Sequence, residues 1–233
     1  MKRAVIAIAF AIASITTSTA SAASIDLIGT GKSLTNISIH SPVLGDILVT
    51  AGEIKWQWLS GQPLGYASSS FYSYCVDVNN AVKDPETVTV NLNGTSSLST
   101  ATGITGTNGG QKAAWLFNTY AAPIHASGSS TANTDAAALQ VAIWAALYNP
   151  TNTLSSNFKL YTTGTIATQA QSYLTALYSA SYMSASTTWL DAGTGAGQDQ
   201  ITANPTPEPA SLVLFGTGLF GIGRALRRRW RQV

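Results

Sequence analysis

The sequence predicts an α+β fold: a mostly antiparallel β-sheet or sandwich in the N-terminal half and a helical cluster in the C-terminal half. Between residues 25 and 92, apolar residues alternate with polar ones, which is typical of strands that bury one face. Between residues 113 and 182, apolar residues recur every three or four positions, which is typical of amphipathic helices. Both ends are apolar runs next to basic residues, so the folded domain is expected to span residues 24–203.

Five strand segments are expected in the first half. The segment 46–59 is predicted to be a hairpin that turns at Ala51-Gly52 and points Trp56 and Trp58 into the core. The strand 71–78 is expected to pair with the strand around residues 88–92, and to place Cys75 and Asp77 on the face opposite Tyr72 and Tyr74. Alternating isoleucines and leucines mark the other two segments, at Ile25 and Leu27 and at Ile37 and Ile39.

Residues 94–110 are rich in Ser, Thr and Gly, and this composition predicts a mobile loop. Three helices follow. The first holds Ala113 to Tyr120 and is expected to end at Pro123. The second is expected to start at Asp135 as its N-cap, to carry one apolar stripe and to stop at Asn149-Pro150; the third spans about residues 166–182. A last strand is expected from Trp189-Leu190 and Gln200-Ile201.

Charge excludes some classes of function. The chain has 233 residues, of which 9% are charged, and its formal net charge is +2. The basic residues concentrate at the two ends, however, and residues 24–203 hold five lysines against nine acidic residues. A mildly acidic body repels phosphate backbones, so nucleic-acid binding is not expected. Two histidines without ligand-like spacing and one cysteine predict no metal site or cofactor and no internal disulfide.

Residues 1–23 have the pattern of a secretory signal peptide. Lys2 and Arg3 precede an apolar run, and Ala20-Ser21-Ala22 supplies the small residues of a cleavage site. A first transmembrane helix is the alternative, but the apolar run is short and polar residues interrupt it.

The C-terminus is predicted to anchor the chain in the inner membrane. A proline-rich linker at 204–209 precedes an apolar segment and a basic tail at 210–233, and the arginines would stay on the cytoplasmic side. Pro207, Glu208 and Pro209, with the tail arginines Arg227, Arg228 and Arg229, resemble the PEP-CTERM sorting signal of Gram-negative bacteria that make exopolysaccharide. The resemblance implies an exosortase as processing partner and a final location at the cell surface or in the extracellular matrix. An ordinary membrane anchor is the alternative.

A second resemblance concerns the single cysteine, Cys75. The segments Tyr74-Cys75-Val76-Asp77 and Leu139-Gln140-Val141-Ala142-Ile143-Trp144 resemble the paired motifs of the Cys-Gln thioester domains of bacterial surface adhesins, although that family usually has Thr where this chain has Leu139. The resemblance implies that Cys75 and Gln140 condense into an internal thioester. A dry site would protect such a bond, so Tyr72, Trp115 and Trp144 are candidates to exclude water, and Asp77 to polarise the attacking or leaving nitrogen.

Three functions remain open. The first is a covalent adhesin or matrix cross-linker, consumed rather than turned over and so not an enzyme, whose partner is an amine- or hydroxyl-bearing surface molecule or exopolysaccharide. The second is a non-covalent structural matrix protein in which Cys75 is an inert core residue. The third is a cysteine hydrolase in which His125 serves Cys75 as base.

Overall fold

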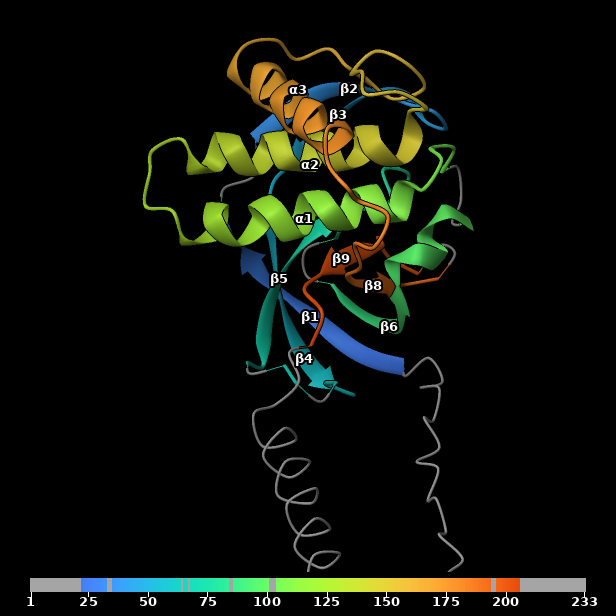
Figure 1. Ribbon diagram of the computed structural model, residues 1–233. Helices are drawn as coiled ribbons and strands as arrows, with labels where there is room; N and C mark the ends of the chain where they lie inside the picture. Colours follow the sequence, from blue (N-terminus) through green and yellow to red (C-terminus); the bar gives the residue numbers. More distant parts are fainter. Residues whose placement is uncertain are drawn as a thin grey trace, which may run out of the picture.

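The computed structural model describes residues 22–205, apart from residues 33–34, 64, 67, 84–85, 101–103 and 194–195. Residues 1–21 of the predicted signal peptide, the Pro-Glu-Pro motif and the C-terminal segment lie outside the described residues, as do the tail arginines, whereas Ala22 and Ala23 belong to the first strand. The described chain confirms the α+β class: strands form a closed barrel and a second small sheet, and three α-helices pack beside them (Figure 1).

Six strands close the barrel in the order β1-β4-β5-β9-β8-β6, and every described pairing within it is antiparallel. Alternation along these strands points one set of side chains inward. Trp56 and Trp58 are buried, as the sequence predicts. The bounds are β1 Ala22–Thr30, β4 Ile54–Ser60, β5 Ser70–Cys75, β6 Thr87–Gly94, β8 Thr188–Asp191 and β9 Gln200–Thr202.

The second sheet has the order β3-β2-β7, from β2 Thr35–Ser41, β3 Gly45–Ala51 and β7 Lys159–Leu160. The predicted hairpin over residues 46–59 is therefore wrong, because β3 pairs with β2 along its whole length while β4 pairs with β1 and β5. The chain crosses between the two sheets near Glu53, which is buried and accepts hydrogen bonds from the Lys32 main chain and from His125.

Two further predictions about the strands are wrong. The strand around residues 88–92, β6, pairs with β1 and β8, whereas β5 pairs with β4 and β9. The expected single last strand is two strands, β8 and β9, which pair with each other and complete the barrel between β6 and β5. Closure explains both differences, because a barrel gives every strand two neighbours and local alternation does not say which.

The helices are α1 Gly109–Ala126, α2 Ala132–Tyr148 and α3 Thr165–Tyr178. Figure 1 shows them stacked beside the barrel, with α1 nearest to it and α3 farthest away. Because α2 packs between α1, α3, β5 and the β2–β3 sheet, it is buried on all sides from Ala136 to Tyr148, not along one stripe as expected. The α2 face that meets β5 can therefore present a side chain to the end of that strand.

Helix boundaries depart from the expected ones. Pro123 lies inside the last turn of α1, which continues to Ala126 because buried Ile124 holds that turn against the core. Helix α2 begins three residues before Asp135, whose carboxylate instead accepts a hydrogen bond from the Thr131 hydroxyl in the first turn. Part of the expected loop 94–110 is a 3-10 helix, η1 Thr95–Thr100, anchored by the buried Leu98.

Candidate functional site

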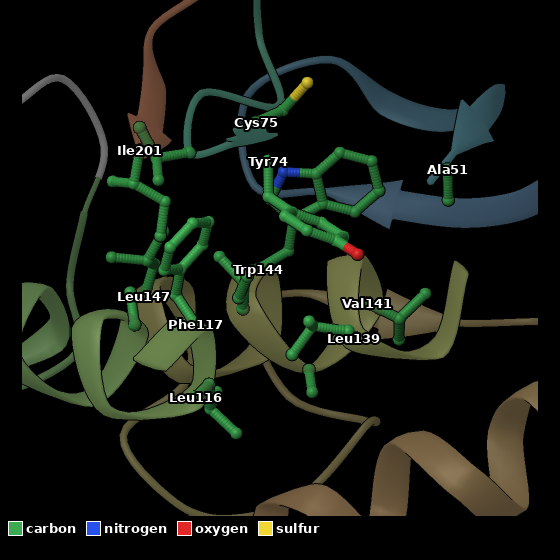
Figure 2. Close-up of a cluster of buried hydrophobic side chains, with 14 of the residues drawn as sticks. Ala51, Tyr74, Cys75, Leu116, Phe117, Leu139, Val141, Trp144, Leu147 and Ile201 are labelled. Atoms are coloured by element: carbon green, nitrogen blue, oxygen red, sulfur yellow. The ribbon is translucent and has the colours of Figure 1, made fainter. Parts of the chain in front are cut away.

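Cys75 is the last residue of β5, and it pairs with Gln200 of the neighbouring strand β9. Its side chain is buried. Figure 2 shows the sulfur turned away from the α2 side chains of Leu139 and Val141. The thiol therefore faces the strands and the 198–200 segment, not the helix.

Two glutamines contact the sulfur. The Cys75 thiol donates to Gln198 Oε1 at 2.5 Å, and Gln200 Nε2 donates to the Cys75 Sγ at 3.3 Å. The first distance is shorter than an ordinary N–H···O hydrogen bond of about 2.9 Å, although sulfur is the larger atom. A carbonyl carbon lies about 1.2 Å from its oxygen, so the Gln198 carboxamide carbon is no more than about 3.7 Å from the sulfur. That separation is close to the distance between reacting atoms in a near-attack arrangement.

Gln140 reaches Cys75 as well, but through the main chain. The Cys75 N–H donates to Gln140 Oε1 at 2.8 Å, and Gln140 Nε2 donates to the Cys75 carbonyl at 2.7 Å. The α2 carboxamide thus takes the place of a neighbouring strand at the end of β5. The structure brings the two predicted thioester residues together, yet the carboxamide that touches the sulfur belongs to Gln198.

The predicted supporting residues are dispersed. Trp144 is buried and lines the same pocket as Cys75. Tyr72, by contrast, packs against His125 in a tilted arrangement with ring centroids 3.9 Å apart, and Trp115 packs edge-on against Tyr120. The described ring contacts of Tyr72 and Trp115 are thus with other aromatic side chains, and their expected role at Cys75 stays a prediction.

Asp77 binds the turn that follows β5 through its carboxylate, a role that was not expected. Its carboxylate accepts hydrogen bonds from the Asn79 main chain and the Asn80 side chain, so it orders the turn after β5. Its main-chain carbonyl accepts a hydrogen bond of 2.8 Å from Gln198 Nε2. The amide nitrogen of Gln198 is thus held by the Asp77 backbone, which fixes the carboxamide with its oxygen toward the thiol.

The thiol is uncharged at neutral pH. Burial raises the pKa of Cys75 to about 12, reinforced by the negative charges of Asp77 and Glu86 and opposed by the hydrogen bond from Gln200. A thiol with such a pKa is a poor nucleophile toward reagents in solution. Any reaction at this sulfur must move the thiol proton in the same step.

A pocket of about 540 Å³ leads to the two groups. Its walls come from β1, from β3 and from the loop after β5, and its lining includes Cys75, Gln198 and Trp144. Within the described part of the chain, none of the residues that line this pocket is charged, and most are apolar. The remaining lining residues are Leu27, Gly29, Thr30, Asn36, Leu44, Ile47, Leu48, Val49, Thr50, Ile54, Val78, Asn79, Asn80, Ala81 and Val82.

His125 does not serve the thiol. Its Nδ1 lies 2.9 Å from Glu53 Oε1, and its ring packs against that of Tyr72. In the described chain, the side-chain partners of the Cys75 sulfur are Gln198 and Gln200. The Cys-His pair required by a hydrolase is not formed. Within the same residues, no group of three or more His, Cys, Asp or Glu side chains is arranged to hold a metal ion.

Gln198 and Gln200 are site residues that the sequence did not predict. The signal was present in Gly197-Gln198-Asp199-Gln200-Ile201, where two glutamines stand two residues apart at a strand that was expected. Gln198 lies two residues before Gln200, the first residue of β9, and residues two apart in an extended segment face the same side, so both amides are directed toward one neighbour. Only the pairing of β9 with β5 shows that this neighbour is Cys75.

In comparison with known protein families, residues 205–229 match the PEP-CTERM protein-sorting motif. The chain carries an exosortase sorting signal. It is therefore an exported protein, processed by an exosortase and bound for the cell surface. No curated protein and no solved structure matches the chain. Among the residues that the structure describes, no helix is long and apolar enough to cross a membrane.

Proposed function

We propose that the exported body forms an internal thioester between the Cys75 sulfur and the side-chain carbonyl carbon of Gln198, and uses it to attach covalently to a partner outside the cell. The observation that carries this proposal is the 2.5 Å contact between Cys75 Sγ and Gln198 Oε1. The sorting signal is consistent with this proposal, because a covalent adhesin or matrix cross-linker acts outside the cell.

Thioester formation needs no oxidant and no cofactor. The Cys75 sulfur attacks the Gln198 carbonyl carbon, an S–C bond forms and the C–N bond of the amide breaks. The thiol proton moves to the departing nitrogen, which leaves as ammonia. A carboxamide is a poor electrophile, so this exchange depends on both groups being held in contact in a dry site. The hydrogen bond from Gln198 Nε2 to the Asp77 carbonyl supports such positioning.

In attachment to the partner, the Cys75 sulfur is the leaving group. An amine or hydroxyl of the partner attacks the Gln198 carbonyl carbon, the S–C bond breaks, and the proton of the acceptor returns to the sulfur. The uncharged lining of the pocket favours an acceptor that arrives neutral, because burying an unpaired charge is costly. The acyl group stays on the partner, a surface molecule or exopolysaccharide, and the protein is consumed in the event.

Intact mass spectrometry of the full chain, secreted and processed, tests the proposal. The expected mass is lower than that of the encoded processed chain by one ammonia, and both Cys75→Ala and Gln198→Leu restore the encoded mass. Peptide mapping should find residues 75 and 198 joined. An unmodified mass with a thiol that can be alkylated after unfolding would contradict the proposal, and a link between residues 75 and 140 would reassign its acyl residue.

The second candidate is a non-covalent structural protein of the extracellular matrix, in which Cys75 is inert. Its support is the burial of the thiol and the raised pKa, since buried cysteines in apolar surroundings are unreactive. It predicts the encoded mass in the wild type. It also predicts that Cys75→Ala leaves surface retention unchanged.

A further inference from the structure

A chain of hydrogen bonds crosses three barrel strands and ends at the thiol. Trp56 Nε1 on β4 donates to Ser73 Oγ on β5 at 2.9 Å, and Ser73 Oγ donates to Gln200 Oε1 on β9, also at 2.9 Å. All three side chains are almost completely buried. A buried polar chain of this kind is stable only when each member is satisfied, so its geometry is tightly specified.

The direction of these hydrogen bonds indicates which end of the Gln200 amide faces Cys75. An indole N–H is only a donor, so it occupies the Ser73 oxygen as acceptor and leaves the hydroxyl proton to be given to Gln200. In the structure the Ser73 hydroxyl donates to the Gln200 oxygen, so that oxygen faces Ser73 and the NH₂ group faces the thiol. The opposite orientation would place the Gln200 oxygen against the Gln198 oxygen, with two acceptors facing each other.

The two hydrogens of Gln200 Nε2 meet two adjacent acceptors. The nitrogen lies 3.3 Å from Cys75 Sγ and 3.2 Å from Gln198 Oε1. These are the two atoms that gain negative charge as a thioester forms or is attacked: the carbonyl oxygen in the tetrahedral intermediate, and the sulfur when it leaves. Donors aimed at such atoms in a water-excluded site stabilise the transition state.

We propose that Gln200 is the oxyanion-stabilising residue of this site, and that Trp56 and Ser73 are positioning residues that keep its NH₂ group directed at the reacting carbonyl. The proposal rests on the proposed thioester between Cys75 and Gln198. In formation, the Gln200 N–H stabilises the oxygen of the adduct while ammonia leaves. In attachment, it stabilises the same oxygen and then the departing sulfur.

The experiment compares wild type with Gln200→Leu and Gln200→Glu in the full secreted chain. Methylamine serves as the acceptor, and the rate at which it is incorporated at residue 198 is followed by mass spectrometry. Both variants lack the N–H donors, so the rate is expected to fall by about 10²–10³-fold, the usual effect of losing one oxyanion donor. Ser73→Ala keeps the amide but frees its orientation, and a smaller decrease is expected.

The controls separate chemistry from folding. Gln171→Leu removes a glutamine whose amide bonds the Asn152 carbonyl, outside the residues that line the Cys75 pocket, and should leave the rate unchanged. If Gln200→Leu fails to fold, Ser73→Ala and Trp56→Phe carry the test, because each removes one hydrogen bond that orients Gln200 and keeps the Gln200 amide itself. Wild-type rates in folded Gln200 variants, or in both positioning variants, would overturn the role of Gln200 while leaving the thioester in place. A wild type without the ammonia deficit would instead overturn the thioester itself, and this inference with it.

Discussion

The side-chain amide of Gln140 satisfies both main-chain groups of Cys75, accepting from its N–H and donating to its carbonyl. A helix side chain thus completes the edge of a barrel strand at the residue that carries the thiol. The same amide is then not the group in contact with the sulfur, which meets Gln198. Gln140 therefore binds the main chain of Cys75, whereas the side-chain carbonyl of Gln198 contacts its sulfur.

Gln140→Leu tests this division. The substitution leaves two buried main-chain groups unpaired, and each costs about 1–3 kcal/mol of folding free energy. Urea unfolding should show that loss, whereas Gln171→Leu on α3 should lose much less. The ammonia deficit should persist in folded Gln140→Leu. If the deficit disappears from chains that are still folded, thioester formation requires Gln140, and peptide mapping of the wild type for a link between residues 75 and 140 then tests whether Gln140 is the acyl residue.

The thiol should be protected when no thioester can form. In Gln198→Leu, Cys75 remains buried, and burial keeps the pKa of its thiol far above neutral pH. Iodoacetamide at pH 8 is therefore expected to react with the folded variant at least about tenfold more slowly than with the same variant in denaturant. Equal rates in the two conditions would show that the thiol is open to solvent.

The free energy of unfolding should depend on pH through Asp199, in a direction set by the raised pKa of its carboxyl group. Burial raises its pKa to about 6 from an ordinary value of 3.8, even though the Ala192 N–H and the Trp189 indole donate to its carboxylate. The folded state then binds the proton more tightly than the unfolded state does, so this residue's contribution to stability falls as pH rises from about 4 to about 6.

The measurement is urea unfolding of wild type and Asp199→Asn at pH 4 and at pH 7. The free-energy difference between the two proteins should favour wild type more at pH 4 than at pH 7. Because Asn does not titrate in this range, the difference isolates the carboxyl group. A difference that is constant with pH, or that moves in the opposite direction, would refute the assignment.

Gly110 should tolerate no side chain. A Cβ at this position would lie 1.7 Å from the Thr95 carbonyl oxygen, where η1 crosses the start of α1. Gly110→Ala is expected to destabilise the fold by about 1–3 kcal/mol, the usual cost of overpacking, even though alanine favours helix. Gly128→Ala is the matched control, because nothing lies within 4 Å of its added Cβ. Melting temperatures of the two variants decide the point, and equal values would contradict the close crossing.

Prediction from the sequence succeeded where local pattern carries the information. Alternation placed Trp56 and Trp58 in the core. The helical period located all three helices, although it did not predict where each one begins and ends. It failed on pairing. Nothing in residues 46–59 says that β3 and β4 belong to different sheets, because both segments alternate equally well and the choice depends on strands remote in sequence.

The site shows the same limit. The sequence predicted that Cys75 and Gln140 lie together, and they do. Gln140, however, contacts the main chain of Cys75 and not its sulfur. Gln198 lies 123 residues beyond Cys75, and only the closure of the barrel through β9 brings its carboxamide to the thiol. The register of β5 against β9 fixes which amide arrives, and register is a property of the assembled sheet.

The sequence by itself determined that this protein leaves the cytoplasm and is sorted at its C-terminus, because a sorting signal is read as a short linear pattern. It also determined the α+β class, since hydrophobic periodicity is local. The tertiary structure alone decided which carboxamide meets the thiol and which way the Gln200 amide points. Those relations depend on hydrogen bonds between strands far apart in the chain, whose geometry no local pattern encodes.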